Sequence, residues 1–231
     1  MKIQEESAAA MDPKVVFIDL DGTLVDSLPK LYAIYLDFLK NFGIKGSKSE
    51  FNEINGPSLP EVIQILKSRY RLPDSSHLLT ELYRSRISHV YDDQNIYIDG
   101  ALETLSLLKK YNLKLILVTS ATKELASLAL KNPQLESVFD DIVTGDMVEK
   151  GKPNPEIYLL ALKKSKLIAT NAVVIEDSLH GVNAAMAAGI YTIRLNSKVS
   201  GVRWHKGWVE LESWNKINSL FQVWCGELSD D

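Results

Sequence analysis

Two aspartates separated by one residue follow a short apolar run near the start of the chain. The run Val15-Val16-Phe17-Ile18 leads directly into Asp19-Leu20-Asp21-Gly22-Thr23. A short β-branched and aromatic run of this kind predicts a buried strand of a parallel sheet that passes into a loop. Open α/β sheets build their sites at such strand ends, where two carboxylates suit a divalent cation and a phosphate. Because Asp-Gly is also a common turn pair, the motif alone leaves a plain turn open.

Other polar side chains follow later predicted strands or the loops just after them. They are Thr119, Ser120, Lys152, Glu176 and Asp177. Parallel strands end at the same edge of a sheet, so we expect these groups to converge on the first aspartate pair. Each also has an ordinary interpretation: the hydroxyls can cap a helix, the acids can complement a helix dipole, and the lysine can be exposed.

Taken together, these residue types support phosphoryl transfer through a phosphorylated aspartate. A carboxylate can attack phosphorus and divide one difficult hydrolysis into two steps. A second carboxylate can protonate the leaving oxygen and then activate water. Mg²⁺ prefers carboxylate and water oxygens, while hydroxyl and N–H groups at a helix N-terminus suit phosphate oxygens. A lysine supplies fixed positive charge for the transition state.

The elements that must position these groups alternate along most of the chain. Apolar residues at helical spacing after Leu28, Leu59 and Leu78 predict a helical unit over residues 27–91. Alternating strands and helices between residues 113 and 195 predict an α/β fold with a doubly wound parallel sheet. We therefore expect a tail over residues 1–13, an α/β core over residues 14–26 and 92–231, and the helical unit over residues 27–91. The last stretch, which holds all four tryptophans, shows no clear period, and we expect its aromatic residues to cover one edge of the sheet.

Composition excludes several classes of function. The chain has 231 residues and a formal net charge of −4, so it offers no basic surface for nucleic acid. Cys225 is the single cysteine, which excludes an internal disulfide and a cysteine metal cluster. No apolar stretch approaches the length of a membrane span, and the polar N-terminus lacks the pattern of a signal or transit peptide. We therefore expect a cytoplasmic protein without a nucleic-acid or membrane partner, present as a monomer or weak homodimer.

Four ordered motifs resemble those of the haloacid dehalogenase superfamily of phosphatases. They are D-L-D-G-T-L-V-D-S, a strand ending V-T-S, G-K-P-N-P-E-I-Y, and V-I-E-D-S-x-x-G-V-x-A-A-x-x-A-G. The resemblance covers about residues 14–195. The helical unit directly after the first motif resembles the subgroup that contains phosphoglycolate phosphatase and β-phosphoglucomutase. It implies a Rossmann-like core and a small all-α cap inserted after the first strand, which closes over the site and selects the substrate.

The resemblance also implies roles for individual residues. Asp19 matches the nucleophile, Asp21 the general acid and base, and Lys152 the lysine that steadies both phosphate and nucleophile. For substrate binding, Thr119 matches the phosphate-binding hydroxyl and Ser120 contributes its amide beside it. For Mg²⁺, the implied ligands are Asp19, the backbone carbonyl of Asp21, Asp177, and Glu176 directly or through water. The implied activity is a magnesium-dependent phosphatase that forms an aspartyl phosphate on a small phosphorylated metabolite, such as a sugar phosphate or phosphoglycolate.

Two alternatives stay open beside the phosphatase. A sugar phosphomutase of the β-phosphoglucomutase type would need a histidine on the first cap helix, where this chain has Pro29-Lys30-Leu31-Tyr32. A receiver-like signalling protein, or a non-catalytic relative that only binds phosphate, would use a similar acidic pocket. Dehalogenation is not expected, because that branch lacks the second aspartate and Asp21 is present.

Overall fold

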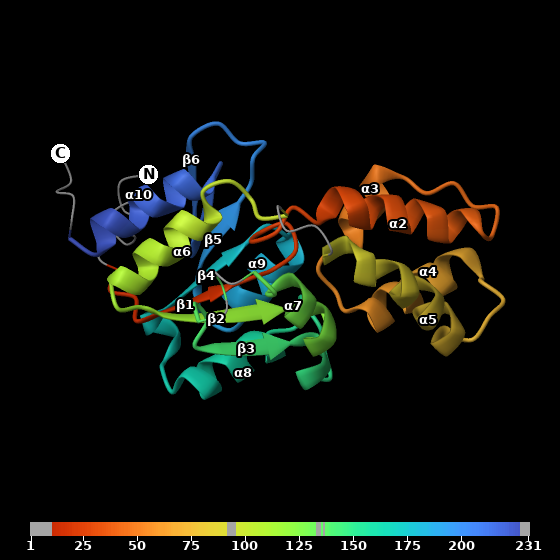
Figure 1. Cartoon of the computed structure of the whole chain (residues 1–231), viewed down its shortest axis with the longest axis horizontal. Helices are drawn as coiled ribbons and strands as arrows, with labels where there is room; N and C mark the ends of the chain where they lie inside the picture. Colours follow the sequence, from red (N-terminus) through yellow and green to blue (C-terminus); the bar gives the residue numbers. More distant parts are fainter. Residues whose placement is uncertain (1–10, 92–95, 133–134, 136, 227–231) are drawn as a thin grey trace.

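A central sheet between helical layers, with a separate group of helices at one side, makes up the computed structural model (Figure 1). It describes residues 11–91, 96–132, 135 and 137–226. Within these residues seven strands form one sheet in the order β3-β2-β1-β4-β5-β7-β6. The strands are β1 Val15–Ile18, β2 Lys114–Thr119, β3 Asp141–Thr144, β4 Ala172–Glu176, β5 Tyr191–Leu195, β6 Val202–His205 and β7 Trp208–Leu211.

Strand β1 lies inside the sheet, between β2 and β4. Val15 pairs with Lys114 on one side and with Ala172 on the other, both in parallel register. Every side chain of β1 is fully buried, as its unbroken apolar sequence predicts. The predicted doubly wound parallel sheet is confirmed except at one edge, where β6 runs antiparallel to β7. That hairpin was not predicted, because two four-residue strands show too little alternation to be recognised.

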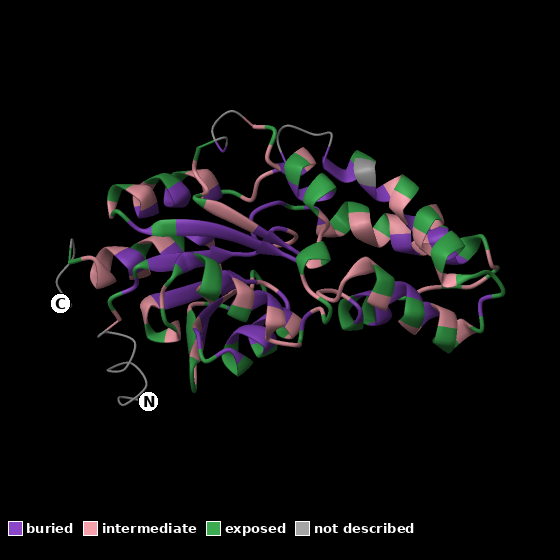
Figure 2. Cartoon of the chain, turned by 90° about the horizontal axis from the view of Figure 1, so that it is seen from below, coloured by how far each residue is buried: buried purple, intermediate pink, exposed green. Residues whose placement is uncertain are grey.

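Alternate residues of the strands feed two hydrophobic cores on opposite faces of the sheet. Val15 and Phe17 pack into a core built with helices α8 and α9, whereas Val16 and Ile18 pack into a core shared with α6, α7 and α10. The bounds of these helices are α6 Ala101–Lys110, α7 Lys123–Ala129, α8 Glu156–Ser165, α9 Leu179–Ala187 and α10 Trp214–Trp224. The strands of the sheet are largely buried (Figure 2). Parallel pairing of β1 with β2 and β4 sets the point at which Asp19 leaves the sheet.

The segment between β1 and α6 contains the second group of helices. They are α2 Leu28–Lys40, α3 Lys48–Glu53, α4 Leu59–Tyr70, α5 Ser76–Ile87 and the 3₁₀ helix η1 Ser88–Tyr91. We call residues 28–91 the helical insert. Its three predicted helices are present, whereas α3 was not predicted. Residues 1–10 of the expected tail over 1–13, and residue 92, at which the core was expected to resume, lie outside the described part of the chain.

The C-terminal helix closes one side of the core. Trp214, at the start of α10, is fully buried and donates its indole N–H to the carbonyl oxygen of Thr23 at 2.8 Å. The segment that showed no clear period therefore supports the loop that carries the first aspartate pair. Among the described residues, no helix combines the length and apolar character that crossing a membrane would require.

Candidate active site

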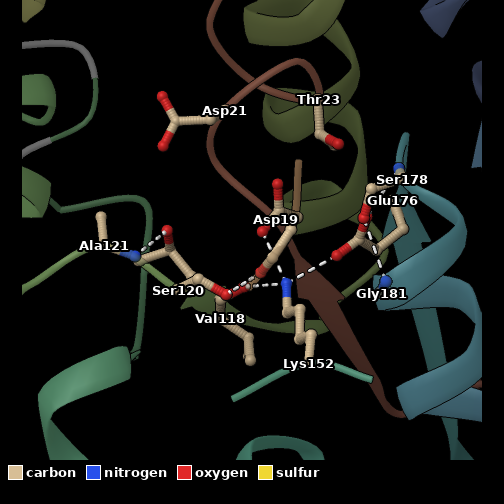
Figure 3. Close-up of polar contacts among 12 residues, drawn as sticks. Asp19, Asp21, Thr23, Val118, Ser120, Ala121, Lys152, Glu176, Ser178 and Gly181 are labelled. Atoms are coloured by element: carbon tan, nitrogen blue, oxygen red, sulfur yellow. Dashed lines mark hydrogen bonds and ion pairs between the residues drawn. The ribbon is translucent and has the colours of Figure 1, made fainter. Parts of the chain in front are cut away.

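A buried lysine joins two acidic residues from different strands. Lys152 lies in the loop before α8 with 1% of its side chain exposed. Its Nζ lies 2.7 Å from Asp19 Oδ1 and 2.6 Å from Glu176 Oε1, and it also donates to the carbonyl oxygen of Val118 at 3.3 Å (Figure 3). Burial alone would lower the Lys152 pKa, but the two carboxylates hold that pKa well above its usual value. The lysine is therefore a fixed positive charge beside Asp19.

Asp19 lies in a strongly acidic environment despite this lysine. Burial, followed by the charge of Glu176, raises the pKa of Asp19 to about 8, although Lys152 opposes the shift. Burial and the charges of Glu176 and Asp19 likewise hold the pKa of Asp177 well above its usual value. A single lysine thus does not balance the carboxylates that surround it, and a bound cation would favour their charged forms.

Three carboxylates are placed where a divalent cation could bind. Oxygen atoms of Asp19, Glu176 and Asp177 lie within 4.8 Å of one another. Carboxylate oxygens and excess negative charge fit Mg²⁺. Glu176 is already engaged by the protein: Oε1 accepts from Lys152 and from the Tyr158 hydroxyl at 3.3 Å, while Oε2 accepts from the Ser178 amide and hydroxyl, both at 3.0 Å. Asp19 and Asp177 are consequently the better placed ligands of the three.

Asp21 lies in the same loop as Asp19 but has a different environment. Its Oδ1 accepts hydrogen bonds from Ser27 Oγ at 2.5 Å and from the Tyr91 hydroxyl at 2.8 Å. Burial raises the pKa of Asp21, and these two hydrogen bonds and Lys152 oppose that shift without cancelling it. A carboxylate with a raised pKa, held away from the lysine, is suited to carry a proton.

The two hydroxyl residues after β2 have different contacts. Thr119 is buried, and its Oγ1 accepts a hydrogen bond from the Ala121 amide at 3.1 Å. Ser120 was expected to contribute its amide, and its side chain donates to the Gly56 carbonyl oxygen of the helical insert at 2.5 Å. Ser120 therefore also joins the sheet edge to the insert.

A cavity of about 420 Å³ lies between the helical insert and the carboxyl edge of the sheet. Its lining includes the predicted site residues Asp19, Asp21, Thr119, Ser120, Glu176 and Asp177. Lys152 is not among the lining residues, since it lies beneath Asp19. The structure therefore brings the predicted residues together around one cavity, with the lysine behind the carboxylates.

Several residues at this site were not predicted from the sequence. Tyr91 and Ser27 hold Asp21, and Arg194 Nε donates to the carbonyl oxygen of Asp177 at 2.8 Å. On the insert, Glu61 Oε1 accepts from the Gly151 amide at 3.1 Å. His180 places its Nε2 2.8 Å from the carbonyl oxygen of Glu53. Apart from the Ser27–Asp21 contact, these contacts join residues at least 17 positions apart, so no local pattern indicates them.

The chain is similar to proteins of known family. The model of the haloacid dehalogenase-like hydrolases matches residues 15–195. A phosphorylated carbohydrates phosphatase of Thermotoga maritima is 33% identical over 180 residues, which cover 78% of this chain and 83% of the relative. A phosphoglycolate phosphatase of Pseudomonas fluorescens is 28% identical over 189 residues, covering 80% and 70% of the two chains. The crystal structure of a β-phosphoglucomutase of Clostridium difficile has the same fold, with a TM-score of 0.80 at 20% identity over 93% of this chain and 98% of that one.

Proposed function

Because the chain belongs to the haloacid dehalogenase-like hydrolases, we propose that it is a phosphatase that cleaves a small phosphorylated metabolite through a phosphorylated Asp19. The observation that carries the proposal is the buried Lys152, which contacts Asp19 at 2.7 Å and Glu176 at 2.6 Å beneath the cavity. Burying a lysine and a carboxylate costs desolvation free energy, so a buried ion pair is weak evidence for a purely stabilising role. Here Lys152 would offset negative charge that develops when Asp19 attacks a phosphate.

The residues divide the reaction between two carboxylates. An Asp19 oxygen attacks phosphorus, and the bond from phosphorus to the ester oxygen breaks. Protonated Asp21 transfers its proton to that leaving oxygen. The Asp21 carboxylate then removes a proton from a water molecule that attacks the phosphorylated Asp19, which releases inorganic phosphate and restores both groups. The raised pKa of Asp21 suits the first transfer, and its hydrogen bonds with Ser27 and Tyr91 favour the charged form needed for the second.

Mg²⁺ is the cofactor that the donor set fits. We assign its binding to Asp19 and Asp177, with the backbone carbonyl of Asp21 and with Glu176 directly or through water. When bound, it would shield the phosphate from the negative charge of the nucleophile and polarise the phosphoryl oxygens. The hydroxyl of Thr119 and the amide of Ser120 would bind phosphate oxygens at the start of the turn into α7.

The helical insert has the role of a cap in this proposal. We propose the division expected from the sequence, with a cap over residues 27–91 and a core over residues 14–26 and 92–231. The cavity lies between the described parts of the two. A cap that closes over the site excludes water and contacts the part of the substrate that is not phosphate. The two relatives named for phosphorylated carbohydrates and phosphoglycolate support a sugar phosphate or phosphoglycolate as substrate.

Release of inorganic phosphate from a panel of esters tests the proposal. Purified protein with Mg²⁺ is expected to hydrolyse one or more of the sugar phosphates, phosphoglycolate, polyol phosphates or nucleotides. Acid quenching of a reaction with labelled substrate is expected to trap label on the wild-type protein and not on Asp19→Asn. Isomerisation of a sugar phosphate without release of phosphate would indicate the mutase instead, and phosphate binding without turnover would indicate a non-catalytic relative.

A further inference from the structure

One carboxylate of the helical insert contacts both its own helix and the loop that carries the lysine. Glu61 Oε2 accepts hydrogen bonds from the Ser58 amide at 2.9 Å and the Ser58 hydroxyl at 2.6 Å, which caps the start of α4. The other oxygen, Oε1, accepts from the Gly151 amide of the core at 3.1 Å. The capping bonds hold the side chain in place, so α4 presents Oε1 to Gly151 in a fixed direction.

The fit at Gly151 leaves no room for a side chain. A Cβ at this position would lie 2.1 Å from Glu61 Oε2 and 3.2 Å from the Ser58 amide nitrogen. Gly151 does not belong to the residues with positive φ, so its backbone is open to other residues. Glycine is needed here because the insert approaches the loop closely, and alanine would test that approach without imposing backbone strain.

Backbone amides of the loop before Lys152 donate hydrogen bonds both to the core and to the helical insert. The amides of Glu149 and Lys150 donate to the Glu156 carboxylate of α8, at 2.9 and 3.1 Å. The next amide, that of Gly151, donates to Glu61 of the insert. Lys152 follows immediately and contacts Asp19. The hydrogen bond nearest to Lys152 on its N-terminal side is therefore the one that Glu61 of the insert accepts.

We infer that Glu61 is a positioning residue that couples docking of the helical insert to the placement of Lys152. The inference rests on the proposed function, since it is Lys152 that steadies Asp19 and phosphate. Without Glu61, the Gly151 amide would bond to water and the loop would lose its contact with the insert. Glu61 does not contact the reacting atoms, and its effect is expected on kcat more than on KM, because a misplaced lysine weakens the transition state rather than substrate binding.

Four variants and a control test the inference. Glu61→Ala removes the hydrogen bonds with both Ser58 and Gly151. Glu61→Gln keeps one acceptor oxygen, so it can accept from Ser58 or from Gly151 but not from both through separate oxygens. Gly151→Ala blocks the approach sterically, and the fourth variant combines Glu61→Ala with Gly151→Ala. The control is Ser47→Ala, which removes the helix cap from α3 of the same insert, where Ser47 Oγ accepts from the Glu50 amide at 3.1 Å. This cap lies outside the cavity lining.

Kinetics and hydrogen exchange give separate results. We expect Glu61→Ala and Gly151→Ala each to lower kcat by about tenfold to hundredfold, as small misplacements of catalytic groups do. The double variant should lose little more than Glu61→Ala alone, because the nearest obstacle that Gly151→Ala meets is the Glu61 carboxylate. Glu61→Gln should fall between wild type and Glu61→Ala. Deuterium uptake over residues 149–153 should rise in Glu61→Ala and stay at the wild-type level in Ser47→Ala.

Independent losses in the double variant, or a kcat for Glu61→Ala equal to that of Ser47→Ala, would overturn the inference while phosphatase activity stands. If the wild-type protein cleaves no phosphate ester, the proposed function fails instead, and with it the catalytic part of this inference. In that case, hydrogen exchange still tests whether Glu61 holds the loop over residues 149–153. Equal uptake over residues 149–153 in Glu61→Ala and wild type shows that Glu61 does not hold the loop.

Discussion

The hydroxyl of Tyr91 donates a hydrogen bond to Asp21, 2.8 Å from Oδ1 and 3.1 Å from Oδ2. Tyr91 is the last residue of η1, at the end of the helical insert, and it is 7% exposed. The carboxylate assigned to proton transfer is thus held from the insert and not only from its own loop. Two of the groups that we assign to the chemistry, Asp21 and Lys152 through its loop, therefore have contacts with the insert.

Tyr91→Phe is expected to shift the pH dependence of the reaction. Burial raises the pKa of Asp21, and the Tyr91 hydroxyl opposes that shift by stabilising the carboxylate. Without the hydroxyl the pKa rises further, so Asp21 stays protonated to higher pH. The alkaline limb of kcat/KM, measured with saturating Mg²⁺, should move to higher pH. Tyr97→Phe, whose hydroxyl contacts the Ala129 carbonyl oxygen instead, is the control. An unshifted limb in Tyr91→Phe would contradict the assignment of the proton to Asp21.

Asp19→Asn is expected to abolish turnover and to stabilise the metal-free protein at neutral to alkaline pH. Burial and Glu176 raise the pKa of Asp19 from 3.8 to about 8, so ionising Asp19 costs the folded state stability as the pH rises between these values. Asparagine removes that cost. In thermal unfolding with chelator, Asp19→Asn should have a higher Tm than wild type at pH 8 and the same Tm near pH 4. The control Asp12→Asn, at an exposed side chain, should change the Tm little at either pH. Phosphate release by Asp19→Asn at the wild-type rate would show that Asp19 is not the nucleophile.

Mg²⁺ is expected to raise the Tm of the wild-type protein and to restore activity after chelation. A ligand that binds only the folded state stabilises it in proportion to the logarithm of its concentration over Kd. Asp177→Asn should lose most of this Tm increase, because Asp177 and Asp19 are the better placed ligands. Glu156→Gln, a carboxylate outside the cluster, should keep it. Full activity in excess chelator would remove the metal from the mechanism.

Glu50→Gln is expected to destabilise the helical insert at neutral pH. Burial alone would raise the Glu50 pKa, but hydrogen bonds led by Tyr35 and Tyr70 outweigh it and hold that pKa below its ordinary value of 4.5. A lowered pKa adds stability above the unfolded value, and this stability is lost as the pH falls through the folded value. Chemical denaturation should show a loss of about 1–3 kcal/mol at pH 7 that shrinks below pH 4.5.

The matched control for that prediction is Glu53→Gln in the same helix. Glu53 pairs with Arg69 at 3.3 Å, but its side chain is 58% exposed. Exposed ion pairs contribute little, so this variant should stay within about 1 kcal/mol of wild type at every pH. Equal effects of Glu50→Gln and Glu53→Gln would show that the buried network around Glu50 does not stabilise the insert.

The sequence predicted the parts of the site that follow from strand order. Asp19, Thr119 and Glu176 each end a recognisable apolar run, and parallel strands bring such ends to one edge, so their convergence needed no further information. Lys152 was expected near these groups because it lies in the loop after a short predicted strand, but its role was assigned by resemblance. The structure places its Nζ 2.7 Å from Asp19 Oδ1. The five parallel strands β1 to β5 were predicted, and the sheet was missed at the β6–β7 hairpin, where each strand has only four residues.

Contacts between the insert and the core could not be predicted from local sequence patterns. Tyr91 lies 70 residues from Asp21 and Glu61 lies 90 residues from Gly151, so no periodic pattern links either pair. They arise from the way the insert packs on the sheet edge. Ser120 shows the same limit: its place after β2 was predicted, and its hydrogen bond with Gly56 depends on a segment that enters from elsewhere in the fold.

The central position of β1 has a consequence for how the protein reaches its native state. Val15 is among the first described residues to leave the ribosome, but its two partners in the sheet, Lys114 and Ala172, are made much later. Until then an apolar strand has no neighbours, and long-range parallel pairing of this kind is slow and exposed to aggregation. The helices of residues 28–91 pack largely among themselves, so they are expected to fold first during synthesis while β1 waits for the rest of its sheet.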